Sequence, residues 1–251
     1  MATAPSLPRI VSREEWKLVH REFLSKEKQA TRAQDALNAD RRRLPMVEVE
    51  KQYVFTGPTG ESRLLDLFEG RRQLIIYHFM FHPDWEEGCP ACSFLVDNFP
   101  HHLSHLHRRD TSLAVVSRAP LSKLRAYQNR MGWSFAWYSS EGSDFNYDFH
   151  VTLDEKVTPV EYNFCDRKAL EQMGMKEFNG VEVPGASVFL RDGERVFHTY
   201  SSYSRGTETF LTTYHLLDLT ALGRQEEWEE PADRHPGPRK GFLRHDKYES
   251  Q

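Results

Sequence analysis

The feature that most constrains the fold is the apolar run Leu74 to Phe81 (LIIYHFMF), which is followed closely by two cysteines, Cys89 and Cys92. A continuous apolar run of this length between charged and Pro boundaries is typical of a β-strand that is buried on both faces. The residues from Cys92 to Phe99 have a helical pattern that ends at Pro100. The chain therefore contains a buried strand, a loop with two cysteines and a helix, in that order.

The position of the cysteine pair favours redox chemistry. An isolated Cys-x-x-Cys motif is ambiguous between metal binding and redox use, but a pair that opens a helix directly after a buried strand matches the thioredoxin-type arrangement. Pro90 suits the first helical position because its missing N–H has no partner to lose there. We expect Cys89 to be the exposed attacking thiol and Cys92 to resolve the mixed disulfide.

The charges around Cys89 oppose one another. A helix N-terminus stabilises a thiolate by roughly 0.3 to 2 kcal/mol. Asp84, Glu86 and Glu87 precede the cysteine, and one carboxylate at about 8 Å with an effective dielectric constant of ~20 opposes a thiolate by roughly 2 kcal/mol before screening. The sequence therefore predicts disulfide exchange but leaves the reduction potential and the direction of the reaction open.

The remaining pattern predicts an α/β fold, a thioredoxin-like three-layer sandwich with an N-terminal helical extension and an insert. Strands alternate with a helix, which implies a largely parallel inner sheet, and Asp192-Gly193 is a strong hairpin signal. The predicted strands are Ser112 to Ser117, Phe135 to Tyr138, Ala186 to Leu190 and Arg195 to Tyr200, and the predicted helix is Pro120 to Met131. The loop-rich insert runs from about Asp144 to Pro184.

Three regions are expected along the chain. Residues 1–45 form a helical arm, in which Ser12 with Glu15 marks a helix start and the first half packs on the rest of the protein. Residues 46–223 form the thioredoxin-like domain. Residues 224–251, rich in Pro and charge, form a mobile tail. A second interpretation of the arm is that it binds a partner, which could be a second copy of the chain in a homodimer.

Composition excludes several classes. The 251 residues carry a net charge of −4, which gives no overall field to attract nucleic acid or an anionic membrane. The apolar run is far shorter than the ~20 residues of a membrane-spanning helix. Three cysteines are an odd and small number, which does not suggest a secreted disulfide scaffold. The amino terminus does not resemble an export signal, so we expect no membrane partner and a cytoplasmic location.

Aromatic and proline residues are candidates for the substrate site. Trp85 precedes the cysteine pair, and Trp137, Phe145 and Tyr147 belong to a dense aromatic group near a turn-rich stretch that suits a shaped pocket. Most of this group also suits the core. Pro184 lies just before the final hairpin, where thioredoxin-type folds place a cis proline beside the cysteines. Only ~5% of X-Pro bonds in folds are cis, so its isomer stays open.

Metal binding is the alternative function. Soft sulfur with imidazole nitrogen suits zinc or copper, and several histidines lie near the cysteine pair: His78, His82, His101, His102, His105 and His107. The spacing is poor, because eight residues separate Cys92 from His101. We therefore assign no metal ligand and no cofactor, and we interpret the histidines as a solvated or hydrogen-bonded turn. Cys165 has no partner pattern and is interpreted as a structural thiol.

Longer motifs give a resemblance. YHFMFHPDWEEGCPACSFLVDNF, VVSRAPL, RMGWSFAWYSSEGSDFNYDFHV, SVFLRDGERVFHTYSSYSRG and TYHLLDLT closely resemble the bacterial thioredoxin-like family catalogued as domain of unknown function 899, over residues 16 to about 224. The resemblance implies a thioredoxin-like fold and a thiol-redox role on an unknown thiol or disulfide substrate. Cys89 and Cys92 match the family's cysteine pair, whereas His82 stands where many members carry a small residue.

Overall fold

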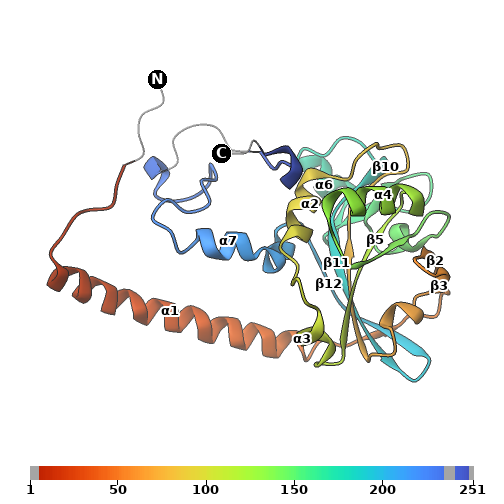
Figure 1. The fold of residues 1–251 in the computed structure, drawn as a ribbon, viewed down its shortest axis with the longest axis horizontal. Helices are drawn as coiled ribbons and strands as arrows, with labels where there is room; N and C mark the ends of the chain where they lie inside the picture. Colours follow the sequence, from red (N-terminus) through yellow and green to blue (C-terminus); the bar gives the residue numbers. More distant parts are fainter. Residues whose placement is uncertain (1–5, 235–240, 249–251) are drawn as a thin grey trace. The chain divides into compact units, whose positions relative to one another are not determined.

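The computed structural model describes residues 6–234 and 241–248 (Figure 1). The expected tail and arm extend into residues 1–5, 235–240 and 249–251, which lie outside the described residues. By their contacts the residues fall into two units, one of residues 1–45 with 213–241 and one of residues 46–212 with 242–251. The expected division into an arm, a domain and a tail, with boundaries at residues 45 and 223, stays a prediction. Mobility of the tail stays a prediction.

An eight-stranded mixed sheet forms the centre of the larger unit. Its strands in spatial order are β1 (Val47–Glu48), β12 (Arg195–Tyr203), β11 (Gly185–Asp192), β4 (Gln73–His78), β5 (Thr111–Ser117), β6 (Ala136–Ser139), β2 (Val54–Gly57) and β3 (Gly60–Arg63). β4, β5 and β6 are parallel to one another, while β11 is antiparallel to both β4 and β12. Two βα units followed by a hairpin were expected, and this order makes the fold thioredoxin-like.

Alternation along the strands divides the core into two layers. Tyr77 and Phe79 face the helices α2 (Pro90–Asp97) and α4 (Leu121–Met131), which lie on the same side of the sheet (Figure 1). Leu74 and Ile76 face the opposite side and belong to a second buried cluster that includes Phe145. Because successive side chains of a strand point to opposite faces, one apolar run supplies both layers.

The insert covers that opposite face. It comprises α5 (Phe145–Asp148), β7 (Thr152–Asp154), β8 (Glu161–Tyr162), β9 (Cys165–Asp166), α6 (Arg167–Gln172) and β10 (Asn179–Glu182). β7 pairs with β10, and β8 pairs with β9. Shorter elements complete the unit: the helix α3 (Ser104–His107) and the 3-10 turns η1 (Asp66–Phe68), η2 (Ser204–Phe210) and η4 (His245–Lys247). The result is a sandwich of helices, sheet and insert.

The smaller unit is built on one long helix, α1 (Arg13–Arg41). Ser12 caps its start by accepting a hydrogen bond from the Glu15 N–H at 3.1 Å, as the sequence predicted. No residue of α1 is buried and Trp16 is 46% exposed, and packing of the first half of the helix on the rest of the protein stays a prediction. The unit also holds most of α7 (Thr212–Leu217) and η3 (Ala232–Arg234).

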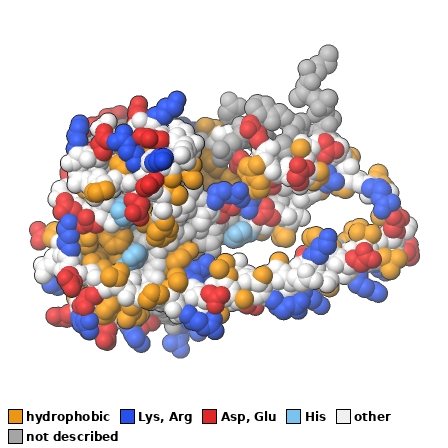
Figure 2. Space-filling model, turned by 180° about the vertical axis from the view of Figure 1, so that it is seen from behind, with side chains coloured by type: hydrophobic (Ala, Val, Ile, Leu, Met, Phe, Trp, Pro, Cys, Tyr) orange, Lys and Arg blue, Asp and Glu red, His pale blue; other side chains and the backbone are white. Residues whose placement is uncertain are grey.

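Charge is distributed rather than clustered on the face drawn in Figure 2, where basic and acidic side chains alternate with hydrophobic ones. Within the described ranges, no helix is long and apolar enough to cross a membrane.

Candidate redox site

Cys89 lies at the N-cap of α2, at the carboxyl end of the central strand β4. Its N–H donates to the Met80 carbonyl at 3.1 Å, and its own carbonyl accepts from the Ser93 N–H at 2.9 Å. Pro90 occupies the first turn, as predicted. The strand end and the helix start therefore fix the backbone of Cys89 from both sides, while its side chain is only partly buried.

Cys92 lies one turn further along α2 and is 1% exposed. Its Sγ accepts a hydrogen bond from the Met80 N–H at 3.4 Å, and the buried Tyr77 hydroxyl donates to the same sulfur. Burial raises the pKa of the Cys92 thiol well above its usual value, and the neighbouring Cys89 acts in the same direction. Cys92 is therefore a protonated, shielded thiol, and both cysteines are present as free thiols.

The Cys89 thiol is activated. Its pKa is lowered to about 6, chiefly by a hydrogen bond from the Cys92 thiol, which outweighs the opposing effect of burial. The backbone N–H groups of Cys92 and Ala91 and the charge of Arg244 lower it further. These N–H groups are the unpaired donors of a helix start, which favour an anion. The pair is thus arranged as one activated and one protected thiol.

The acidic residues before the cysteine oppose the thiolate less than their number suggests. Glu87 forms ion pairs with Arg130 and, at 2.9 Å, with Arg244. The side chains of Asp84 and Glu86 are 90% and 92% exposed, where water and salt screen their charge. The two arginines thus offset the charge of Glu87, and the balance that the sequence left open favours the thiolate, chiefly through the hydrogen bond from Cys92.

Tyr127 of α4 is linked to Cys89 through Ser93 by two hydrogen bonds. Its hydroxyl lies 2.9 Å from Ser93 Oγ, and Ser93 Oγ donates to the Cys89 carbonyl at 2.8 Å. Sequence reasoning missed Tyr77, Ser93, Tyr127 and Arg244. The two tyrosines and the serine lie in apolar or helical patterns that do not distinguish a core residue from a site residue, and Arg244 lies in the expected tail.

The structure separates the residues that were proposed to bind substrate. Trp85 is 36% exposed in the cysteine loop. Trp137 and Phe145 are 1% and 0% exposed and lie in the two core layers on opposite faces of the sheet. Tyr147 is half-buried, and the Arg118 guanidinium lies 5.2 Å from its ring centroid. Burial favours a core role for Trp137 and Phe145, and substrate binding by any of the four stays a prediction.

Pro184 precedes β11, whose first residue, Gly185, pairs with His78 at the end of β4. Its carbonyl accepts a hydrogen bond from the Tyr162 hydroxyl at 2.8 Å. Within the described residues the one cis peptide bond is Glu230–Pro231, so the Val183–Pro184 bond is trans. Pro184 thus has the expected place in the chain, in the trans form.

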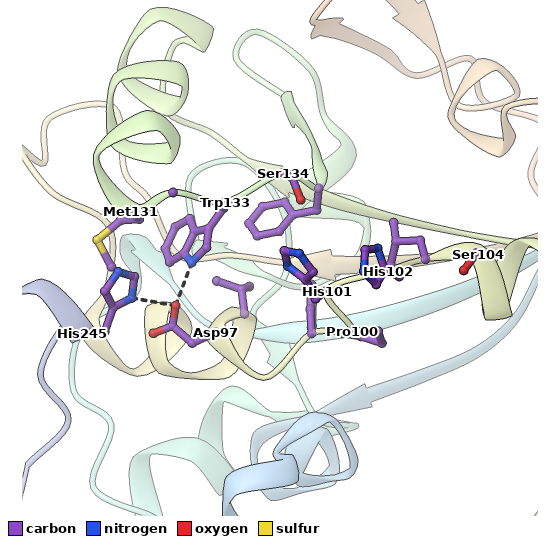
Figure 3. Close-up of a pocket in the computed structure, with 14 residues that line it drawn as sticks. Asp97, Pro100, His101, His102, Ser104, Met131, Trp133, Ser134 and His245 are labelled. Carbon is purple, nitrogen blue, oxygen red and sulfur yellow. Dashed lines mark hydrogen bonds and ion pairs between the residues drawn. The ribbon is translucent and has the colours of Figure 1, made fainter.

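The histidines do not gather around the thiols. His78 is buried and bonds to Ser187 Oγ at 2.9 Å, and burial lowers its pKa to about 3. His101 and His102 line a pocket of about 420 Å³ at the far end of α2, where Trp133 and His245 both point at Asp97 (Figure 3). Across the described ranges, no three His, Cys, Asp or Glu side chains are grouped as a metal site.

A buried carboxyl group lies near the end of β10. Glu182 is 3% exposed, pairs with Arg118 at 3.0 Å and accepts a hydrogen bond from Thr152 at 3.0 Å. Burial raises its pKa to about 7, against the opposing effect of Arg118. The carboxyl group therefore titrates near neutral pH.

Fold and site together define a thioredoxin-like protein with a dithiol at the start of the first helix after the central strand. The family model described as "Bacterial protein of unknown function (DUF899)" matches residues 5–248, and the chain belongs to this family. The family resemblance seen in the sequence is confirmed.

The chain is similar to several solved structures. A cysteine-to-serine mutant of PrxQ from Xylella fastidiosa is 10% identical over 65% of this chain and 88% of its own, with a TM-score of 0.40. A peroxiredoxin Q structure from Xanthomonas campestris is 11% identical over 66% and 94%, with a TM-score of 0.41. A putative protein disulfide isomerase from Bacteroides thetaiotaomicron is 16% identical over 68% and 91%, with a TM-score of 0.38. No curated protein matches the chain.

Proposed function

We propose that this protein is a thiol-disulfide oxidoreductase that cycles Cys89 and Cys92 between a dithiol and a disulfide. The observation that carries the proposal is the asymmetry of the pair: Cys89 is partly exposed with a pKa lowered to about 6, and Cys92 is buried and protonated beside it. A low-pKa thiol that is accessible is the nucleophile in disulfide exchange.

The first step transfers one sulfur bond. The Cys89 thiolate attacks one sulfur of a substrate disulfide, the substrate S–S bond breaks, and the leaving thiolate takes a proton from water. Cys89 is then joined to the substrate in a mixed disulfide. The helix N–H groups that stabilised the thiolate remain directed at Cys89 Sγ, and they stabilise the Cys89 thiolate again when an external dithiol reduces the protein.

The second step uses Cys92. Its thiol loses a proton to water and attacks Cys89 Sγ, which breaks the bond between Cys89 and the substrate and forms the Cys89–Cys92 disulfide. The second substrate sulfur leaves as a thiolate and takes a proton from water. The charge that develops on Cys92 Sγ meets two donors, the Met80 N–H and the Tyr77 hydroxyl. The substrate gains two electrons and two protons, and an external dithiol must return the protein to its reduced form.

The lowered pKa of Cys89 also bears on direction. Stabilising the thiolate stabilises the reduced protein, and this makes the protein disulfide a stronger oxidant than a pair with ordinary thiols. Trp85 and Pro184 are the proposed substrate contacts. The proposed location is the cytoplasm, supported by the sparse use of cysteine.

The test is the reaction of the reduced protein with a small aromatic disulfide that releases a coloured thiolate, in a Cys165→Ser background. We expect two thiolates released per chain. Cys92→Ser should release one quickly and retain the mixed disulfide on Cys89, which mass spectrometry identifies. Cys89→Ser should lose the fast phase, and a fast phase that survives this substitution contradicts the proposal.

A further inference from the structure

The C-terminal segment Phe242 to Tyr248 lies along the cysteine helix. Phe242 stacks on Phe94 of α2 with ring centroids 5.0 Å apart. His245 Nδ1 is 2.8 Å from Asp97 Oδ1 at the end of the same helix (Figure 3). Contacts at both residues hold the segment along α2, and Arg244 lies between them.

Arg244 reaches the loop that leads to Cys89. Its Nε and Nη2 donate to the Gly88 carbonyl at 3.1 and 2.6 Å, and Nε also donates to the Tyr127 hydroxyl at 2.9 Å. Its Nη1 pairs with Glu87 at 2.9 Å. One guanidinium therefore contacts the two residues that immediately precede the attacking cysteine, together with the tyrosine that supports it.

A further ion pair holds the segment. Asp246 pairs with Arg130 Nε at 2.7 Å, and Arg130 also pairs with Glu87. Asp246, Arg130, Glu87 and Arg244 thus form an alternating chain of charges across α4, the cysteine loop and the C-terminal segment. Because Glu87 is paired on both sides, its negative charge is balanced next to the thiol.

We propose that Arg244 is a positioning residue of the redox site, carried there by the C-terminal segment to fix the Gly88 carbonyl and to balance Glu87. The inference rests on the proposed thiol chemistry of Cys89. Without the guanidinium, Glu87 keeps Arg130 as its partner and the Gly88 carbonyl loses the two N–H groups of Arg244, so less of the negative charge next to Cys89 is balanced. The Arg244 side chain is 19% exposed, so water screens its charge less than at an open surface.

The contacts require arginine rather than any cation. A guanidinium presents several N–H groups in one plane and serves a carbonyl, a hydroxyl and a carboxylate together, whereas an ammonium is a single point charge on a flexible stem. Its link through Tyr127 continues to Ser93 and the Cys89 carbonyl. Arg244 is thus connected to the backbone on both sides of Cys89: to the preceding Gly88 carbonyl directly, and to the Cys89 carbonyl through Tyr127 and Ser93.

The test is the pH profile of Cys89 alkylation by iodoacetamide in the full chain, measured by peptide mass spectrometry on reduced protein. Arg244→Met should move the midpoint of the alkylation profile to higher pH. At pH values below the wild-type midpoint, alkylation of Cys89 should slow by at least about threefold, since each pKa unit is a tenfold change in the thiolate fraction. Arg244→Lys should restore part of the loss. Arg109→Met, which removes an equal charge from an exposed position at the opposite end of β5, should leave the profile unchanged.

An unchanged profile in folded Arg244→Met overturns the inference. Should that variant fail to fold by circular dichroism, Arg244→Gln carries the same expectation and the same overturning result. We expect every Arg244 variant to release two thiolates per chain from the aromatic disulfide. If the wild-type chain itself does not release two thiolates, the proposed function fails, and this result is distinct from a failure of the Arg244 inference.

Discussion

Glu182 is a carboxyl group for which burial and pairing have opposite effects on the pKa. Its Arg118 partner favours the charged form, but removal from water raises the pKa to about 7. The folded protein therefore retains a proton that the unfolded chain releases near its ordinary pKa of 4.5. Protonation of Glu182 stabilises the fold, and this contribution is complete below that value and is lost as the pH rises through about 7.

Glu182→Gln should remove this dependence. As the pH rises from 4.5 to about 7, the free energy of unfolding of the wild type should fall by on the order of 3 kcal/mol more than that of the variant. Urea unfolding at a series of pH values measures the difference. Glu177→Gln, at an exposed position, is the control and should follow the wild type. Parallel pH curves for wild type and Glu182→Gln contradict the account.

The sequence predicts the two reacting residues but not the residues that tune them. Cys89 and Cys92 are recognisable because strand, loop and helix signals surround them within about twenty positions. Tyr77 and Tyr127 are indistinguishable from core aromatics until the packing is known. Sequence reasoning overestimates how strongly Glu87 opposes the Cys89 thiolate, because the two arginines that pair with Glu87 are distant along the chain.

At the scale of elements, the cysteine loop depends on a close approach of backbone to aromatic rings. A Cβ on Gly88 would lie 2.6 Å from Phe79 Cε1 and 3.0 Å from Tyr127 Cε1. The Phe79 ring packs on Tyr127, Trp133 and Trp137, so neither ring can move without displacing others. Glycine is therefore required immediately before Cys89.

Gly88→Ala should lower the free energy of unfolding by about 1 to 3 kcal/mol through overpacking. Denaturant titration with a two-state fit measures the change. Gly241→Ala is the matched control, because a Cβ there meets no heavy atom within 4 Å. Equal stability of the Gly88 and Gly241 variants contradicts the packing described here.

Most elements follow from local pattern. The buried run predicts β4, Asp192-Gly193 predicts the β11–β12 hairpin, and Ser12 predicts the start of α1. The interaction of α1 with the rest of the chain could not be predicted in the same way. Apolar residues at helical spacing indicate a face that could be covered, and they do not specify what covers it; here Trp16 and Phe23 remain exposed.

At the scale of the whole molecule, the redox site lies within the larger unit, and its residues come from two segments of the chain, 46–212 and 242–248. Arg244 and Gly88 are 156 positions apart. No periodicity marks residues 241–248, which the sequence pattern assigns to a charged tail. Contacts of this separation depend on side chains that meet only after the sheet and α2 have formed, so sequence pattern alone does not reveal them.

The most direct test of the central claim is a redox titration of the full chain. The protein is equilibrated in mixtures of reduced and oxidised glutathione, its remaining thiols are alkylated, and each cysteine is quantified by mass spectrometry. We predict that Cys89 and Cys92 lose their thiols together in one two-electron transition and form one disulfide, while Cys165 stays a thiol or forms a separate glutathione adduct. Failure of Cys89 and Cys92 to form a disulfide at any glutathione ratio would contradict the account.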